Sequence, residues 1–218
     1  MSKRVAVVLS GCGVFDGSEI YETVITLLRL DQQNAKVQCF APNVPQMHVI
    51  NHLNGEVCEG ETRNVLVEAA RLARGDIKNL ADANPADFDA LIVPGGFGAA
   101  KNLSDFAVKG AQMKVNDDLQ KLVQGMHQQG KPVGLVCIAP AMAGVLFGKG
   151  VQCTIGNDAD TAAAINATGA VHRDCSVDEI CIDEANKLVT TPAYMLAGRI
   201  SEAAVGINKL VDEVLVRT

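Results

Sequence analysis

Four short hydrophobic segments, separated by stretches with helical periodicity, constrain the fold of this chain most strongly. Each segment is only a few residues long and rich in β-branched or aliphatic side chains, as expected for strands buried on both faces. Strands that alternate with helices form a mostly parallel sheet with helices on both faces. The sequence therefore predicts an α/β fold whose main strands cover residues 5–9, 36–41, 89–94 and 131–136.

The predicted helices begin at residues that cap helices well or that follow turns in the chain. One β-hairpin is expected at residues 180–183 and 187–190, and segment 43–60 is irregular apart from a short extended piece at 48–52. The helices are expected at residues 18–33, 62–73, 104–109, 116–129, 139–147, 158–168 and 196–216.

The composition indicates a single domain, residues 1–218, with a sizeable core. Hydrophobic residues make up 48% of the 218 positions, and no linker, low-complexity stretch or internal repeat divides the chain. No apolar stretch reaches the roughly 18 residues of a membrane-spanning helix. We therefore expect no membrane partner.

The charge balance narrows the class of partner. The formal net charge is −6, only 4% of the residues are aromatic, and there is no Trp. A nucleic-acid-binding surface needs a basic face, and binding of single strands also uses aromatic side chains for stacking. Composition therefore argues against a nucleic-acid partner and favours a small molecule or a protein.

The seven cysteines do not form a recognisable metal or disulfide pattern. Their number is odd, no CxxC occurs, and the closest pair in the sequence is Cys175 and Cys181. A chain with a core of this size does not need disulfides for stability. The cysteines are interpreted as reduced thiols, most of them buried, and a cytoplasmic location is expected.

Cys137 is the residue that we expect to carry the chemistry. It directly follows the apolar residues 133–136, and Ala139-Pro140-Ala141 then begins a helix, which is the arrangement of a nucleophile elbow. Because a helix N-terminus stabilises negative charge, the pKa of the Cys137 thiol is expected to be lowered. The alternative is an ordinary small residue of the core.

A second loop begins with Gly95 and Gly96, directly after the strand at 89–94. Glycines at such a point let backbone N–H groups turn toward a ligand and stabilise a developing oxyanion. The N–H groups of Gly96 and Ile138 are the expected pair. A plain turn after a strand is the alternative interpretation.

Glu19 is the third candidate, because it begins the first helix at the carboxyl end of the first strand. A carboxylate beside a cysteine can hydrogen-bond to its sulfur and can transfer protons, and burial in a dry pocket would raise its pKa. Glu22 lies one turn later and is the competing candidate. The alternative for Glu19 is a residue that only complements the helix dipole.

Two further patterns carry weaker signals. Gly11, Gly13 and Gly17 resemble a dinucleotide-binding loop, but their spacing differs and no acidic residue ends the second strand, so no cofactor is expected. His172 is the sole histidine after Cys137, and it is interpreted either as a partner of the thiol or as a surface residue. No metal site is expected.

Taken together, the three loops resemble the class I glutamine amidotransferase-like superfamily, in its ThiJ/PfpI branch, and more narrowly its ElbB-like group. The resemblance extends over nearly the whole chain. It depends on Gly134-Leu-Val-Cys-Ile-Ala-Pro140, Leu9-Ser-Gly-Cys-Gly-Val-Phe-Asp-Gly-Ser-Glu19, Val49-Ile-Asn-His-Leu-Asn-Gly55, Glu61-Thr-Arg-Asn64, Pro94-Gly-Gly-Phe-Gly-Ala-Ala-Lys-Asn102 and Thr190-Thr-Pro-Ala-Tyr-Met-Leu196.

The resemblance implies a flavodoxin-like three-layer sandwich, commonly a homodimer. It also implies a cofactor-independent glyoxalase that converts glyoxal, a small aldehyde substrate, to glycolate, and a looser association with isoprenoid biosynthesis. In the expected mechanism the Cys137 thiolate forms a hemithioacetal and Glu19 moves a proton between the two carbons. The backbone N–H groups at Gly95, Gly96 and Ile138 bind the substrate oxygen.

The chain departs from the wider superfamily where many members carry a histidine about 20 residues beyond the cysteine, because residues 154–158 contain none. Glutamine hydrolysis and peptidase activity are therefore not expected, and turnover should be slow. The alternatives are a non-catalytic binding or regulatory protein and a redox sensor that responds through Cys137.

Overall fold

The computed structural model describes residues 2–218. Within them seven strands form a central sheet in the order β10-β11-β7-β6-β1-β2-β5, and every neighbouring pair is parallel except β10 and β11. The strands are β1 (Arg4–Val8), β2 (Lys36–Ala41), β5 (Ile77–Asn79), β6 (Ala90–Val93), β7 (Val133–Val136), β10 (Cys181–Asp183) and β11 (Leu188–Thr191).

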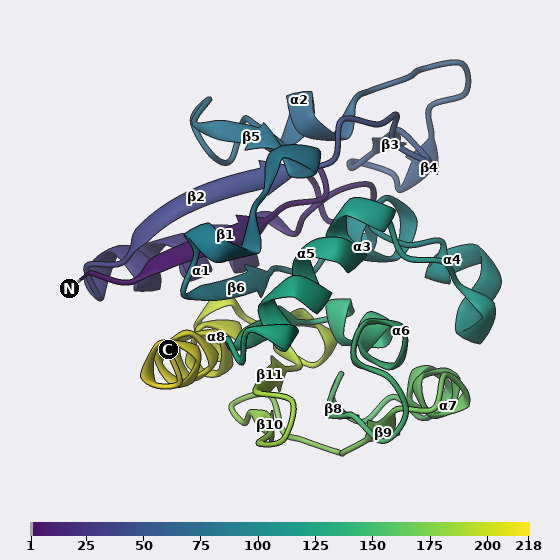
Figure 1. Cartoon of the computed structure of the whole chain (residues 1–218). Helices are drawn as coiled ribbons and strands as arrows, with labels where there is room; N and C mark the ends of the chain where they lie inside the picture. Colours follow the sequence, from purple (N-terminus) through teal and green to yellow (C-terminus); the bar gives the residue numbers. More distant parts are fainter. Residues whose placement is uncertain (1) are drawn as a thin grey trace.

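Helices cover both faces of this sheet (Figure 1). Two short strand pairs lie outside it, β3 (Ile50–Asn51) with β4 (Glu56–Val57) and β8 (Gln152–Cys153) with β9 (Val171–His172). The helices are α1 (Ile20–Gln32), α2 (Val65–Ala69), α3 (Phe97–Lys101), α4 (Phe106–Lys109), α5 (Asp117–Gln128), α6 (Ala143–Phe147), α7 (Ala159–Ala167) and α8 (Ile200–Val216).

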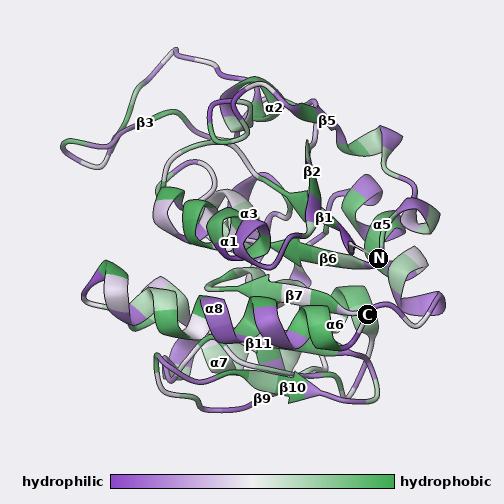
Figure 2. Ribbon diagram, turned by 90° about the vertical axis from the view of Figure 1, so that its left-hand side faces the viewer, coloured by the Kyte–Doolittle hydropathy of each residue, from purple (hydrophilic) through white to green (hydrophobic). Residues whose placement is uncertain are grey.

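The alternation of side chains along each strand divides the core between the two faces. In β1, Val5 and Val7 pack with α1, α2 and α8, whereas Ala6 and Val8 pack with α3, α5 and α6. All four side chains are fully buried, and Figure 2 shows the hydrophobic residues concentrated on the central strands. The prediction of a flavodoxin-like three-layer α/β sandwich is confirmed.

The order of the strands brings three loops together. The strands β1, β6 and β7 are neighbours and parallel, so the loops that follow their carboxyl ends meet at one edge of the sheet. Three backbone hydrogen bonds join the first two loops: from Glu19 N to the Gly95 carbonyl at 2.9 Å, from Phe97 N to the Val14 carbonyl at 2.8 Å and from Gly98 N to the Gly17 carbonyl at 2.8 Å. The loops after β1 and β6 are therefore held together at this edge of the sheet.

Several predicted boundaries differ from the structure for local reasons. The first helix begins at Ile20 because Glu19 is its N-cap, and α2 begins later than expected because Asn64 caps it. The expected helix at 139–147 begins as a 3₁₀ turn, Ala139–Met142, before α6. The final helix begins at Ile200, because a separate 3₁₀ turn, Ala193–Met195, precedes it.

The strands β4, β5, β8 and β9 and the helix α3 were not predicted from the sequence. These elements are two to five residues long, and β5 lies at the edge of the sheet with only partly buried side chains. Across residues 2–218, no helix is long and apolar enough to cross a membrane.

Candidate functional site

Cys137 occupies the tight turn between β7 and the 3₁₀ turn Ala139–Met142. Its φ angle is 62°, in the left-handed region that residues other than glycine rarely adopt. The turn is held by a hydrogen bond from Cys137 N to the Thr191 carbonyl at 2.9 Å. Cys137 is buried, at 7% exposure. The predicted nucleophile-elbow conformation is present, and its strain is about 1–3 kcal/mol for such a residue.

Glu22, in the first turn of α1, is the carboxyl group that contacts the Cys137 sulfur. Its side chain is fully buried. One carboxyl oxygen, Oε2, accepts a hydrogen bond from Gly95 N at 3.0 Å, and the other, Oε1, accepts one from Tyr194 N at 3.1 Å. Three segments of the chain thus fix this carboxyl beside the thiol.

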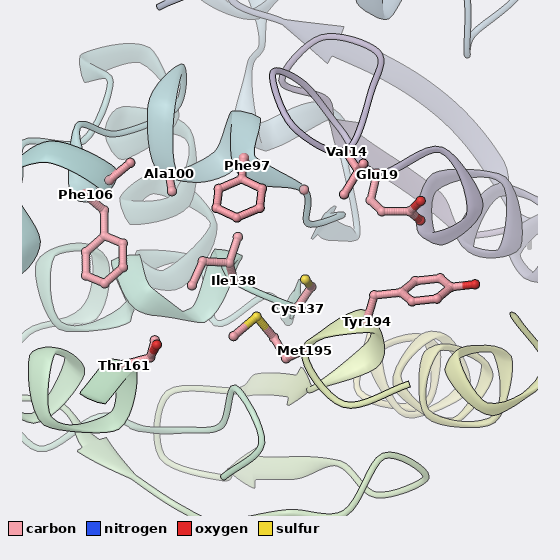
Figure 3. Close-up of a pocket in the computed structure, with 12 residues that line it drawn as sticks. Val14, Glu19, Phe97, Ala100, Phe106, Cys137, Ile138, Thr161, Tyr194 and Met195 are labelled. Atoms are coloured by element: carbon pink, nitrogen blue, oxygen red, sulfur yellow. The ribbon is translucent and has the colours of Figure 1, made fainter. Parts of the chain in front are cut away.

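Glu19 takes a different role from the one that the sequence analysis expected. Its Oε2 atom accepts a hydrogen bond from Glu22 N at 2.7 Å, which makes Glu19 the N-cap of α1. Figure 3 shows the Glu19 carboxyl pointing away from the Cys137 sulfur, although Glu19 lines the same cavity. The contact with sulfur, which sequence analysis expected of Glu19, is made by Glu22.

The two glycines of the second loop permit this close packing. A Cβ atom on Gly95 would collide with the Cβ atom of Cys137 and lie 2.7 Å from Oε2 of Glu22. Gly96 has a φ angle of 94° and no room for a side chain against the backbone of residues 17–19. Only glycine fits at either position.

The backbone N–H groups of Gly96 and Ile138 lie beside the Cys137 sulfur and act to lower its pKa. They are the two groups that the sequence analysis expected to bind a substrate oxygen. In this structure they point to the sulfur, so an oxygen bonded to a carbon on that sulfur would lie next to the same donors.

Burial determines the protonation of Glu22 and Cys137. It raises the pKa of Glu22 to about 8, and the neighbouring carboxylate of Glu19 adds to the effect. Burial, followed by the charge of Glu22, raises the pKa of Cys137 well above its ordinary value, and the two N–H groups offset only part of this. The pKa of Glu19 is also raised by burial.

The prediction of a lowered pKa for Cys137 is therefore wrong. It depended on the dipole of a helix beginning after the thiol, but that segment is a 3₁₀ turn followed by the five-residue helix α6. So short a helix has a weak dipole, and desolvation with a carboxylate in contact outweighs it.

A cavity of about 430 Å³ opens above the thiol. Its walls come from the loops after β1, β6 and β7 and from α3, α4, α7 and the turn at 193–195 (Figure 3). Most of its lining is apolar. The lining residues are Val14, Glu19, Gly96, Phe97, Ala100, Phe106, Ala107, Cys137, Ile138, Thr161, Tyr194 and Met195.

His172 belongs neither to this site nor to the surface. Its side chain is only 2% exposed, and Nε2 accepts a hydrogen bond from Ile155 N at 3.1 Å. Both earlier interpretations of His172 are therefore wrong, because its ring, in β9, is buried and accepts the hydrogen bond from Ile155. Burial lowers the pKa of His172. Within residues 2–218, no group of three His, Cys, Asp or Glu side chains is placed to hold a metal ion.

The fold and the site define an α/β protein with a buried cysteine at a nucleophile elbow and a carboxyl group in contact with its sulfur. The model of the DJ-1/PfpI family matches residues 3–195, and the chain belongs to this family. The resemblance inferred from the sequence, to the ThiJ/PfpI superfamily, is confirmed.

The chain is similar to proteins from distant organisms over nearly its whole length. It is 50% identical to the human mitochondrial glutamine amidotransferase-like class 1 domain-containing protein 3, over 97% of this chain and 82% of that protein. A solved structure of an isoprenoid biosynthesis protein with an amidotransferase-like domain from Ehrlichia chaffeensis is 35% identical, with a TM-score of 0.92 and 99% of each chain covered.

A more distant structure, glyoxalase III from Candida albicans, shares the fold. Its TM-score is 0.63 at 16% identity, with 99% of this chain and 97% of that chain covered. At this identity the similarity concerns the fold. The more similar proteins carry names that state no reaction.

The expectation of a cytoplasmic protein is wrong. The human relative is a mitochondrial protein, which points against a purely cytoplasmic location. The expectation depended on thiols interpreted as reduced and on the lack of a long apolar stretch. Both features occur in proteins of more than one compartment, so composition could not separate them.

Proposed function

We propose that this protein is a cysteine-dependent, glyoxalase-type enzyme that converts glyoxal to glycolate without a cofactor. The observation that carries the proposal is the Cys137–Glu22 contact at the base of a cavity, with the N–H groups of Gly96 and Ile138 at the same sulfur. Nucleophile, proton carrier and oxyanion donors are the three parts that this reaction needs.

The first step is addition of the thiol to one aldehyde carbon. The Cys137 sulfur forms a bond to that carbon, and Glu22 takes the thiol proton and passes it to the carbonyl oxygen, which gives a hemithioacetal and restores the Glu22 carboxylate. The N–H groups of Gly96 and Ile138 stabilise the oxygen while it carries negative charge.

The second step moves hydrogen between the two carbons. The Glu22 carboxylate removes the proton from the carbon bonded to sulfur and returns it to the neighbouring carbon. The hydroxyl proton of the first carbon moves to the oxygen of the second, which becomes the alcohol. The first carbon is then a thioester, and water cleaves it to glycolate and the free thiol. One carbon is oxidised and the other is reduced, so no external redox partner is needed.

The protonation of Glu22 and Cys137 at neutral pH supports a slow reaction that becomes faster as the pH rises. At neutral pH most of Glu22 is protonated, since its pKa is about 8, and the thiol holds its proton even more firmly. We expect kcat/KM to rise as the pH increases through about 8, because the carboxylate that accepts protons becomes available.

The direct test is the formation of glycolate from glyoxal by the wild-type protein, Cys137→Ala and Glu22→Gln. Cys137→Ala should form none. Glu22→Gln should lose about 10²–10⁴-fold, the usual contribution of a general acid–base group. Undiminished product from Cys137→Ala would contradict the mechanism.

Alkylation by iodoacetamide shows whether Glu22 carries protons in the reaction or activates the Cys137 thiol. The charge of Glu22 raises the pKa of Cys137, so Glu22→Gln should lower that pKa and speed alkylation of Cys137 at about pH 9, where most of Glu22 in the wild type is ionised. Faster alkylation together with lost turnover identifies Glu22 as a proton carrier. Slower alkylation in the variant would instead show that Glu22 activates the thiol.

The raised pKa of Cys137 favours one alternative, a non-catalytic protein that uses the cavity for binding, and disfavours a redox-regulatory role, which needs a thiol of low pKa. Its setting would be isoprenoid biosynthesis, the process in the name of the Ehrlichia chaffeensis protein. A partner recovered equally well by wild type and Cys137→Ala, with no glycolate formed, would favour this alternative.

A further inference from the structure

The cavity extends well beyond the reacting atoms. Figure 3 shows Cys137 near its middle, with Phe106 and Thr161 at the end opposite Glu19 and Tyr194. Its volume of about 430 Å³ lies in the range of about 300–1,000 Å³ that is typical of sites for drug-sized ligands. Glyoxal, the smallest dicarbonyl, would leave most of this space unused.

The end of the cavity at Phe106 is apolar. Ala100, Phe106, Ala107 and Ile138 line it with carbon atoms, and the Thr161 hydroxyl is the polar group there. Water in such a space has few hydrogen-bond partners, so an apolar group that displaces it is favoured. This part of the cavity is suited to a hydrocarbon substituent.

The charges around the cavity disfavour an anionic substituent. No lysine, arginine or histidine is among its lining residues within the described part of the chain, and Glu19 is the acidic residue that lines it. The nearby Lys101 donates a hydrogen bond to the Phe15 carbonyl at 2.8 Å, and its Nζ lies 5.4 Å from the centre of the Phe97 ring. A buried carboxylate on the substrate would have no cation to pair with.

From these three observations we infer that the substrates are uncharged α-oxoaldehydes, R–CO–CHO, in which R is a branched alkyl or aryl group that occupies the Phe106 end. The inference rests on the proposed function and names its substrate class. The Cys137 sulfur adds to the aldehyde carbon, hydrogen moves from that carbon to the keto carbon, and water releases the 2-hydroxy acid R–CH(OH)–COOH. The atoms balance with water as the co-reactant.

Turnover of three probes tests the inference: tert-butylglyoxal, glyoxal and 4,5-dioxopentanoate, an α-oxoaldehyde that carries a carboxylate. We expect kcat/KM for tert-butylglyoxal to exceed both others at least about tenfold, since each methyl group in a fitted apolar pocket is worth about tenfold or more. A kcat/KM for glyoxal or 4,5-dioxopentanoate equal to or above that for tert-butylglyoxal overturns the inference and leaves the proposed function standing.

A variant that fills the apolar Phe106 end of the cavity tests whether the substituent R binds there. Ala100→Leu should reduce the ratio of kcat/KM for tert-butylglyoxal to that for glyoxal by about tenfold. Ala86→Leu, the same change at an exposed position outside the cavity, should leave the ratio unchanged. If Ala100→Leu does not fold, Phe106→Ala should reduce the same ratio by removing apolar contact. A constant ratio in a folded variant of either residue places the substituent elsewhere.

A binding measurement separates failure of the inference from failure of the proposed function. The unreactive tert-butyl methyl ketone should slow alkylation of Cys137 by iodoacetamide, whereas its carboxylate analogue 3,3-dimethyl-2-oxobutanoate should not at equal concentration. Protection by the ketone alone, with no turnover of any probe, refutes the enzyme and retains the binding preference. Equal protection by both, or by neither, refutes the preference.

Discussion

Glu22 makes the stability of the protein depend on pH. Its pKa in the folded protein is about 8, against an ordinary value of 4.5, because burial disfavours the charged carboxylate. The folded protein therefore binds this proton more tightly than the unfolded chain does. The stabilising contribution is complete below pH 4.5 and is lost as the pH rises through about 8.

Between these limits the loss is about 1.4 kcal/mol of unfolding free energy per pH unit. We predict that urea unfolding at pH 5.5 and pH 8.5 shows a larger decrease for the wild type than for Glu22→Gln, which has no proton to lose. The comparison uses each protein as its own reference, so any fixed cost of the amide cancels. Equal decreases in the two proteins would contradict the buried, protonated carboxyl.

Gly95 offers a steric test of the same site. Gly95→Ala places a methyl group against Cys137 and Glu22, and we predict a destabilisation of about 1–3 kcal/mol together with loss of glyoxalase turnover. Gly198→Ala is the matched control, because a Cβ atom there meets only Glu202 at 3.7 Å. Thermal unfolding and glycolate formation measure both effects. A Gly95→Ala protein as stable and active as the control would show that the loop is not tightly packed.

At the scale of the element, Glu19 determines where α1 begins. We predict that Glu19→Ala lowers the unfolding free energy by about 0.5–2 kcal/mol, since the N–H of Glu22 loses its capping acceptor. Glu19→Gln keeps a side-chain oxygen for the cap and should cost less. Denaturant unfolding of both variants measures the difference.

The same pair of variants separates capping from catalysis. If Glu19 is mainly a cap, Glu19→Gln should retain far more turnover than Glu22→Gln. A loss in Glu19→Gln as large as the loss in Glu22→Gln would return the proton-transfer role to Glu19.

The long elements could be predicted from the sequence, because they are determined by burial. The strands β1, β6 and β7 read as continuous apolar runs since both faces of the sheet are covered. The edge strand β5 has only partly buried side chains and therefore lacks this pattern. Helix α3 follows Gly96 and has no side-chain cap, so no local signal marks its beginning.

The site residues that follow the ends of strands could be predicted from the sequence. The carboxyl group on α1 could not, because its identity depends on the residue at which the helix begins. Cys137, Gly96 and Ile138 follow strands directly, so their meeting follows from the strand order. The choice between Glu19 and Glu22 depended on the first residue of α1. An N-cap at Glu19 would have assigned its carboxyl to the N–H of Glu22 and left Glu22 free to contact sulfur.

The part of the cavity wall that comes from α4 and α7 was not predictable. Phe106 and Thr161 lie on α4 and α7, which no local pattern relates to Cys137. Their positions result from packing between distant segments. The substrate preference inferred above could therefore come only from the structure.

At the scale of the whole molecule, α1 exposes an apolar stripe although its other face is buried. The stripe consists of Ile20, Tyr21, Val24 and Leu28, which are 42%, 52%, 48% and 53% exposed. Neighbouring apolar groups of this kind are typical of protein–protein contacts. We propose that the stripe forms the homodimer contact expected from the sequence, with the same helix from two copies packed across a two-fold axis.

We predict that the wild-type protein sediments as a dimer and that Val24→Asp shifts it toward the monomer by placing a charge in the contact. Leu53→Asp is the control, since Leu53 is 95% exposed in the turn between β3 and β4, away from α1. Analytical ultracentrifugation over a range of concentrations gives the result. A monomeric wild type, or a Val24→Asp protein that remains a dimer, would contradict the proposed contact.

The backbone conformation of Cys137 is unfavourable for stability, although the proposed reaction needs a cysteine at this position. A φ angle of 62° is comfortable for glycine, and glycine at this position would relax the turn at no steric cost. A chain selected for durability alone would therefore have little reason to keep a cysteine here. Random mutation followed by selection for heat resistance alone should replace Cys137 early. Loss of this thiol would then indicate that catalysis is no longer under selection.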